Sequence, residues 1–269
     1  MTHTFDPGYF EEPFSSLVRE HPGPDVYPPG QFRVEWGPIF HRGRLDGSAR
    51  VLIIGQDPAQ HETIVRRILV GEAGRRVQGL LAKLGTTRSY VLINTFLYSV
   101  YGSVKAATRK SPSLVGYRNL WLNALLAGDK VEAVVTLGTA AAEAWELWKA
   151  TPAGQASDVA FAPVTHPTQP ESFSKGNKTK LAQATKKLLK NWNTALQTLA
   201  PAIQHPDVAG AAQPYGETWG PNERPPIPED DFPAGLPAWM HEDGWAKRAG
   251  SNVLAKRRNI TVTVPKGII

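Results

Sequence analysis

The sequence contains no cysteine among its 269 residues. This absence excludes disulfide scaffolds, thiolate nucleophiles, cysteine-ligated zinc and iron–sulfur clusters. The sequence also lacks any apolar run of the about 18 to 20 residues that a membrane-spanning helix requires. Its first residues, MTHTFDPGYFEEPF, are acidic and interrupted by proline, unlike a secretory signal. We therefore expect a protein that does not associate with membranes and lies in the cytoplasm, at the nucleoid if it is bacterial.

Two common phosphate-binding patterns, GxxxxGKS/T and GxGxxG, are also missing, which disfavours a nucleotide-binding or phosphoesterase domain. The charge balance is mildly basic, with 30 Lys and Arg against 24 Asp and Glu and a net charge of +6. Such a charge permits a polyanionic partner such as nucleic acid but does not require one. No cluster of potential metal ligands stands out, so we expect neither a metal nor another cofactor.

Glycine and proline gather at residues 22–38 and 201–237, on either side of a segment with regular apolar patterns. This distribution predicts an N-terminal arm over residues 1–30, one domain over residues 31–200, and a C-terminal extension over residues 201–269. The extension is rich in proline and tryptophan. Because exposing several tryptophans is costly, we expect it to pack on the domain.

The domain alternates short apolar runs with amphipathic stretches. Around a Gly-Pro turn, residues 32–45 favour a hairpin-like start. The runs predict buried strands at 50–54, 89–95, 131–137 and 159–164, and the stretches predict helices at 74–84, 113–126, 139–148 and 178–199. This order indicates an α/β fold, with a central, mainly parallel four-stranded sheet flanked by helices and irregular arms at both ends.

Three polar residues follow predicted strands: Asp57, Asn94 and His166. Taken singly, each residue type is common in turns and caps. The carboxyl ends of parallel strands, however, meet at one rim of a sheet, which is where α/β proteins bind their ligands. The three side chains together therefore predict a functional site.

The sequence around these residues resembles the uracil-DNA glycosylase superfamily. The resemblance is carried, in family order, by GQDP at 55–58, ILVGEAGRRVQGLL at 68–81, VLIN at 91–94, TLGTAAAEAW at 136–145 and THPTQPES at 165–172. It spans about residues 50 to 200 and implies the three-layer fold of that superfamily. The second and fourth segments are most similar to the thermophilic, iron–sulfur branch, whose cluster-binding cysteines are all missing here.

The resemblance also marks three departures. Ala59 stands where classical family 1 enzymes have a tyrosine that excludes the methyl group of thymine. Leu69 stands where the superfamily has an aromatic ring that stacks on the flipped base. Pro170 stands where family 1 has a leucine wedge.

The superfamily's chemistry assigns roles to the matching residues. Cleavage of the N-glycosidic bond gives the sugar oxocarbenium character and leaves a uracil anion. The resemblance implies that Asp57 and His166 are catalytic, with the carboxylate beneath the sugar and the imidazole donating to uracil O2. Asn94 would read O4 and N3–H of uracil, since an amide offers one donor and one acceptor. Gln56 and Ala59 would contribute backbone contacts, and Leu69 would cover the base.

A base inside a duplex must be flipped out before it can react, and the flanking backbone must be held. We expect Thr168, Ser172, Lys175 and Lys178 to contact DNA, with Arg109, Lys110 and Ser111 as a second group. The C-terminal extension raises two alternatives. Its cations, Lys247, Arg248, Lys256, Arg257 and Arg258, could touch DNA, or its ITVTV segment could be a surface strand that extends the sheet or pairs with the N-terminal hairpin.

The sequence thus predicts a monomeric, monofunctional uracil-DNA glycosylase of base-excision repair, acting on single- or double-stranded DNA that contains uracil and leaving an abasic site. Two alternatives remain open. One is a protein that binds uracil-containing or abasic DNA with weak turnover, suggested by the altered wedge and stacking positions. The other is a glycosylase for a different damaged base, for which Ala59 leaves room.

Overall fold

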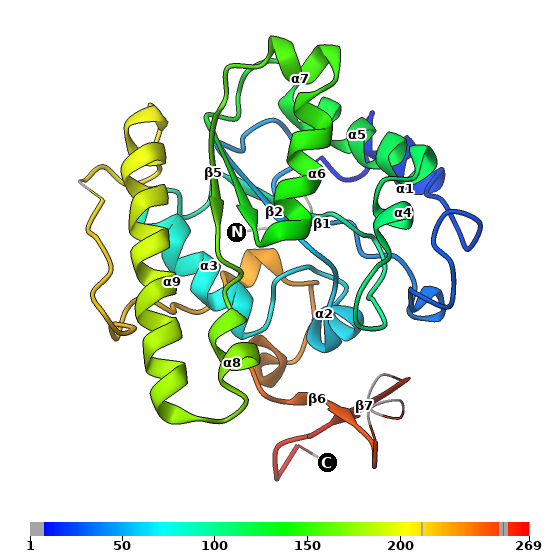
Figure 1. The fold of residues 1–269 in the computed structure, drawn as a ribbon, viewed down its shortest axis with the longest axis vertical. Coiled ribbons are helices and arrows are strands. Elements are labelled where there is room, and N and C mark those ends of the chain that lie inside the picture. The colour runs from blue at the N-terminus through cyan, green and yellow to red at the C-terminus, as the bar shows by residue number, and fades with distance from the viewer. Residues whose placement is uncertain (1–7, 211, 253–254, 256–257, 269) are drawn as a thin grey trace.

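The computed structural model describes residues 8–210, 212–252, 255 and 258–268. Its centre is a five-stranded sheet between two layers of helices (Figure 1). The sheet has the order β1-β3-β2-β4-β5, and all neighbours are parallel except β1 and β3. The strands are β1 His41–Gly43, β2 Val51–Gly55, β3 Tyr90–Asn94, β4 Ala133–Leu137 and β5 Ala160–Val164.

The helices cover both faces of the sheet because strands β2, β3 and β4 are apolar on both sides. On one face, Leu52 and Ile54 pack with a core cluster that includes Trp121 and Trp145. On the other, Val51 and Ile53 pack with helix side chains such as Trp192. The helices that flank the sheet are α1 Phe14–Arg19, α5 Pro112–Leu126 and α6 Thr139–Lys149 on the first face, and α3 Glu72–Lys83 and α9 Lys178–Leu199 on the second.

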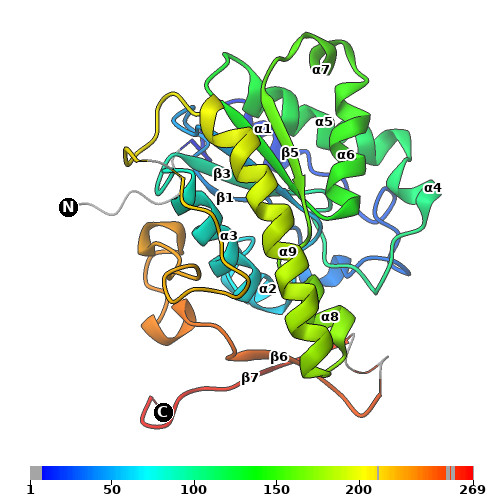
Figure 2. The same cartoon turned by 60° about the vertical axis from the view of Figure 1, so that its left-hand side comes forward.

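In the described part of the chain, four further short helices lie in the connections, and Figure 2 shows α8 beside the lower end of α9. They are α2 Gln60–Val65, α4 Ala106–Arg109, α7 Pro152–Ala156 and α8 Gln169–Ser174. None of the described helices combines the length and the apolar character that crossing a bilayer requires.

The predicted α/β fold class is confirmed, but the sheet has five strands instead of the expected four. The additional strand, β1, arises within residues 32–45, where we expected a hairpin. Residues Val34–Trp36 instead form a 3-10 turn that ends at Gly37, and β1 pairs antiparallel with β3. Gly43 permits this pairing, because its φ is 97° and a Cβ there would lie 2.4 Å from the carbonyl oxygen of Tyr90.

The ITVTV segment neither extends the central sheet nor pairs with the N-terminal region. Its strand β7, Asn259–Val262, pairs antiparallel with β6, Ala246–Ala249, in a separate two-stranded sheet. Both edges of the central sheet are already occupied by β1 and β5 in the order given above. Figures 1 and 2 show the β6–β7 hairpin at the same end of the molecule as α2 and α8.

The C-terminal extension is joined to the domain by a buried ion pair. The Asp231 carboxylate accepts hydrogen bonds from the guanidinium of Arg42, at 2.7 Å, and from that of Arg44. The hydroxyl of Tyr90 donates to the same carboxylate at 2.7 Å. Trp245, which is only 5% exposed, adds an apolar anchor in a cluster with Val65 of α2.

Candidate active site

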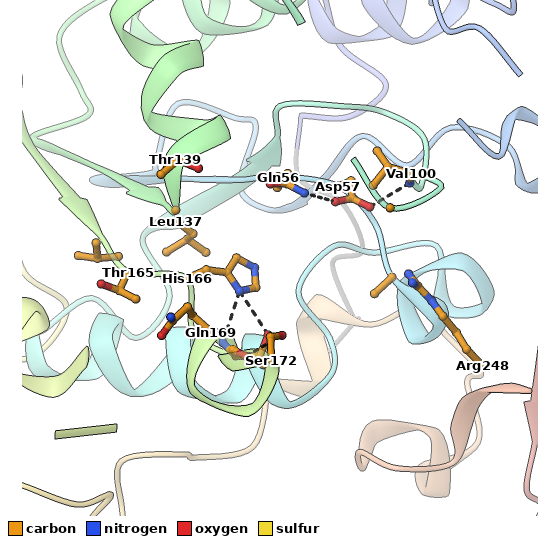
Figure 3. Close-up of a pocket in the computed structure, with 15 residues that line it drawn as sticks. Gln56, Asp57, Val100, Leu137, Thr139, Thr165, His166, Gln169, Ser172 and Arg248 are labelled. Atoms are coloured by element: carbon orange, nitrogen blue, oxygen red, sulfur yellow. Dashed lines mark hydrogen bonds between the residues drawn. The ribbon is translucent and has the colours of Figure 1, made fainter. Parts of the chain in front are cut away.

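A cavity of about 690 Å³ opens at the carboxyl ends of strands β2, β4 and β5. Of the ten residues that we proposed for catalysis, for base recognition and for the first group of DNA contacts, it contains six: Gln56, Asp57, Ala59, His166, Thr168 and Ser172. Figure 3 shows Asp57 and His166 on different walls of this space. Polar groups from distant parts of the chain therefore meet where parallel sheet topology places them.

Asp57 follows β2 directly and is fixed by two hydrogen bonds. The side-chain amide of Gln56 donates to Oδ1 at 2.9 Å, and the backbone N–H of Val100 donates to Oδ2 at 3.0 Å (Figure 3). Burial raises the pKa of the Asp57 carboxyl, and the two donors and the charges of Arg248 and Arg33 oppose that rise. The carboxylate is thus held rigidly in a partly dehydrated place.

Arg33 supports the loop that binds Asp57. The backbone N–H of Arg33 donates to the carbonyl of Ser99 at 2.8 Å, and its guanidinium donates to the Ser99 hydroxyl at 2.9 Å and to the Val100 carbonyl. The same guanidinium lies over the rings of Trp36 and Tyr101, 4.6 and 4.4 Å from their centroids. A fully buried arginine thereby positions the Val100 N–H that holds the carboxylate.

His166 follows β5, and its ring nitrogens are distinguished by Thr168. The backbone N–H of Thr168 donates to Nδ1 at 3.4 Å, so Nδ1 is the unprotonated nitrogen in this arrangement. The proton of a neutral ring then resides on Nε2. Burial lowers the pKa of His166, and the positive charge of Arg76 lowers it further. The site therefore presents a neutral imidazole.

Arg76 on α3 ties the His166 loop to the domain. Its guanidinium donates to the Pro167 carbonyl at 2.6 Å and to the Glu171 carboxylate at 2.7 Å. A third bond, at 2.8 Å, joins it to Glu72 one helical turn earlier. Four hydrogen bonds and burial make this arginine a rigid support behind the imidazole.

Ala59 lines the cavity but has little free backbone to offer. Its N–H donates to the Glu62 carboxylate at 3.1 Å, in the manner of a capping box at the start of α2. Gln56 acts through its side chain on Asp57, while its carbonyl accepts from Phe96 at 2.9 Å. Within the protein, Ala59 thus uses its N–H on Glu62 and Gln56 uses its side chain on Asp57, and the expected backbone contacts to a substrate stay a prediction.

Asn94 and Leu69 do not line the cavity but meet beside it at Gly55. A Cβ on Gly55 would lie 2.3 Å from Oδ1 of Asn94 and 3.7 Å from the Leu69 side chain. Asn94 is 7% exposed, and within the part of the chain that the structure describes its amide has no hydrogen-bond partner. Leu69 has a φ of 52°, a left-handed conformation that is strained for leucine. Unpaired polar groups and strain of this kind are typical of binding sites.

The predicted DNA contacts divide into two groups. Thr168 and Ser172 line the cavity, whereas Lys175 and Lys178 are exposed beyond it, at the end of α8 and the start of α9. Pro170, at the wedge position of family 1, is buried in α8 and cannot insert into DNA.

Arg109 and Lys110 are engaged elsewhere, because both pair with Glu143, at 2.6 and 3.4 Å. Arg109 and Glu143 line a neighbouring cavity of about 340 Å³, which shares Gln56, Gly102 and Thr139 with the first.

Sequence reasoning missed that Arg248 reaches this cavity. We named it among the cations of the extension, yet nothing in the sequence placed it near Asp57. The structure places it on β6, with its side chain directed toward the Asp57 side of the cavity (Figure 3). Lys256 and Arg257 lie outside the described residues. Among the residues that are described, no group of three His, Asp or Glu side chains is arranged to hold a metal ion.

The sequence profile of the uracil DNA glycosylase superfamily matches residues 42–196, which is more than half of the chain. The chain belongs to this superfamily. No curated protein sequence matched it. Membership indicates that the uracil DNA glycosylase superfamily's general chemistry applies here, namely hydrolytic removal of bases from DNA in repair. The matched range includes Asp57, Asn94 and His166 and ends before the extension that carries Arg248.

Proposed function

We propose that the protein is a uracil-DNA glycosylase, which flips uracil out of DNA and hydrolyses its N-glycosidic bond to leave an abasic site. The observation that carries this proposal is the pairing of a fixed carboxylate, Asp57, with a neutral imidazole, His166, in one cavity. The first group suits a developing positive charge and the second suits a developing anion. In this role the protein would start base-excision repair.

Asp57 would act on the sugar. As the bond between C1′ and N1 breaks, its electron pair moves into the base and C1′ becomes cationic. A carboxylate already held by Gln56 and the Val100 N–H would stabilise that cation without reorganising. It would also orient the water whose oxygen then bonds to C1′, and it would accept the proton that this water loses.

His166 would act on the leaving base. With Nδ1 accepting from Thr168, the Nε2 proton is free to donate to O2 of the departing uracil anion. A neutral imidazole can donate this hydrogen bond while the pKa stays low enough to keep the ring uncharged before reaction. Arg76 supports this arrangement from behind, through the Pro167 carbonyl and through its charge.

Asn94 and Leu69 would recognise the flipped base. The unpaired Asn94 amide can accept from N3–H and donate to O4 of uracil, whereas cytosine presents the opposite pattern. Leu69, next to it at Gly55, would cover the face of the ring with an aliphatic surface. A left-handed φ persists only where the surrounding structure fixes the residue, so the contact from Leu69 would be preorganised.

Release of labelled uracil from single-stranded and duplex oligonucleotides tests the proposal. We expect multiple turnovers by the wild-type protein, and losses of about 10²- to 10³-fold in Asp57→Asn and in His166→Ala. Asp25→Asn and His205→Ala, which change exposed residues outside the cavity, serve as matched controls. Full activity in both site variants would refute the site. A tight complex with abasic DNA without free uracil would favour the binding-protein alternative.

A wider substrate range is the second candidate, and Ala59 favours it. This small side chain lines the cavity, so a substituent at C5 of uracil meets no bulky group from this position. Equal rates on uracil, 5-methyluracil and 5-hydroxymethyluracil would support the wider range. A strong preference for uracil would show that another residue excludes the substituent.

A further inference from the structure

Among the described residues of the C-terminal extension, Arg248 of the β6–β7 hairpin lines the candidate active site. The hairpin consists of strands Ala246–Ala249 and Asn259–Val262 and lies beyond the segment matched by the family profile. Figures 1 and 2 show it projecting beside α2 and α8, and Figure 3 shows Arg248 entering the cavity from it. A contribution to this site from outside the family segment requires its own explanation.

The hairpin is anchored to the helix that follows Asp57. The ring of Trp245 packs edge-on against His61 of α2, with centroids 4.9 Å apart. The next residue, Ala246, is buried and donates its backbone N–H to Nε2 of His61 at 3.3 Å. The indole N–H of Trp245 donates to the Glu242 carbonyl at 2.9 Å. The backbone of Arg248 therefore lies two residues from Ala246, whose position is fixed by its hydrogen bond to His61.

Arg248 is an exposed cation whose guanidinium N–H donors are not used within the described part of the chain. Among the described residues, no hydrogen bond or ion pair holds its guanidinium. Its positive charge acts against the larger effect of burial to lower the pKa of Asp57, on the cavity wall, and it also lowers the pKa of the buried Arg33. Arg109 differs, because Glu143 neutralises it at 2.6 Å. Arg248 thus offers an unpaired positive charge at the mouth of a site where DNA must lie.

A phosphate is the ligand that these features suit. A guanidinium binds a phosphate through two parallel N–H donors, which an exposed arginine at a cavity mouth can aim freely. Hydroxyl groups that also bind phosphates, those of Thr168 and Ser172, line the same cavity from α8 and the loop before it. A DNA strand whose base enters the cavity would pass between the guanidinium of Arg248 and the hydroxyl groups of Thr168 and Ser172.

We propose that Arg248 binds the DNA phosphate next to the flipped nucleotide, and that the β6–β7 hairpin is thereby a DNA clamp over the Asp57 side of the cavity. The proposal rests on the proposed function, since it takes DNA with a flipped base as the ligand. Lys247 provides an internal comparison. Neighbouring residues of a strand point to opposite faces, and Lys247 does not line the cavity.

The test measures binding to a labelled duplex that carries a tetrahydrofuran abasic analogue, over a series of KCl concentrations. We expect Arg248→Gln to weaken binding about tenfold and to reduce the salt slope by about 0.9, the amount for one lost phosphate contact. Arg248→Lys should keep the slope, because it keeps the charge. Lys247→Gln should change both quantities much less. Equal losses in Arg248→Gln and Lys247→Gln would overturn the proposal, because they would show only general attraction.

Uracil release, measured on the same proteins, separates this inference from the proposed function. If the wild type releases uracil, Arg248→Gln should raise KM about tenfold and change kcat much less, because burial and two hydrogen bonds act on Asp57 more strongly than the charge of Arg248 does. Wild-type binding and kinetics in Arg248→Gln would overturn the clamp and leave the glycosylase intact. If the wild type releases no uracil but the salt slopes differ as predicted, the proposed function fails and the DNA contact stands.

Discussion

The guanidinium of Arg76 donates a 2.6 Å hydrogen bond to the carbonyl of Pro167, the residue directly after His166. One buried cation therefore fixes the loop that carries the imidazole and also disfavours protonation of that imidazole. Burial is the larger cause of the lowered pKa of His166, and the charge of Arg76 is the second. The position and the protonation state of His166 are therefore coupled through Arg76, whose side chain does not line the cavity.

Replacing Arg76 by Gln should loosen the loop that carries His166 and raise the pKa of His166. We expect the pKa of His166 to rise toward its ordinary value of 6.5, because a neighbouring positive charge is removed. Protonation would then begin at a higher pH, so activity should fall earlier on acidification. Ring ¹⁵N chemical shifts of His166 and the pH profile of kcat measure these changes. Arg75→Gln, on the same helix but paired with the exposed Glu242, is the control. An unchanged titration of His166 would contradict the electrostatic role.

Gly55→Ala should reduce activity without touching a catalytic group. The new Cβ would approach Oδ1 of Asn94 to 2.3 Å, so the amide must move from its place. We expect a loss similar to that of Asn94→Ala, and little further loss in the double variant, since both changes remove one interaction. Gly116→Ala is the control, because nothing lies within 4 Å of its Cβ. Additive losses would show that Gly55 and Asn94 act separately.

Ala59→Tyr should narrow the substrate range. Ala59 has an extended backbone, with φ −103° and ψ −164°, which any side chain tolerates, and it lines the cavity. A ring at this position should hinder a substituent at C5 more than it hinders uracil. The measurement is the ratio of kcat/KM for uracil to that for 5-methyluracil, which should increase. Ala59→Ser, which adds one small atom, should leave the ratio nearly unchanged.

Phe173→Ala should affect duplex DNA more than single strands. Phe173 is 58% exposed, and it neighbours Ser172 on α8, whose side chain lines the cavity. Gln169, one helical turn earlier, lines it too, so Phe173 projects from the same side of the helix. An exposed ring here can enter the stack that a flipped base leaves, as apolar wedges do in other DNA complexes. Phe10→Ala, at a residue 79% exposed on the N-terminal arm, is the control. Equal losses on both substrates would exclude a wedge.

Asp231→Ala should destabilise the fold by about 3 to 5 kcal/mol, since it leaves two arginines without their buried partner. Burial alone would raise the pKa of Asp231, but Arg42 and Arg44 outweigh it and hold the pKa below 3.8. The carboxylate therefore stabilises the fold above pH 3.8, and this contribution disappears as the pH falls through the lower, folded-state pKa. Urea unfolding at several pH values measures the difference from wild type. The exposed Glu229→Ala is the control, and a small, pH-independent difference in Asp231→Ala would refute the network's role.

The central strands of the domain could be predicted from the sequence. A short strand that is buried on both faces is apolar at nearly every position, and such a run stands out in the sequence. Val51–Gly55 and Tyr90–Asn94 are of this kind. The edge strand His41–Gly43 could not, because its three residues, His, Arg and Gly, carry no such pattern. It becomes a strand through pairing with a segment far along the chain and through the charge of Asp231.

The sequence predicted the site residues that follow strands but not the arginines that act on them. Asp57 and His166 end strands, so topology alone brings them to one rim. Arg76 and Arg248 escaped prediction for different reasons. Arg76 looks like any polar residue of an amphipathic helix until the loop it binds is known. Arg248 depends on the anchoring of Trp245 against His61, a contact between residues that sequence periodicity does not relate.

The bond between Arg42 and Asp231 spans 189 positions of the chain. A ribosome makes the glycosylase motifs well before it makes Asp231, so the nascent sheet first carries its edge arginines with no counter-charge. The central strands can pair during this interval, but Arg42 cannot be desolvated favourably until the acidic residue emerges. Synthesis of residues after the sheet thus couples completion of the core to the arrival of Asp231 and, soon afterwards, of the strand that bears Arg248.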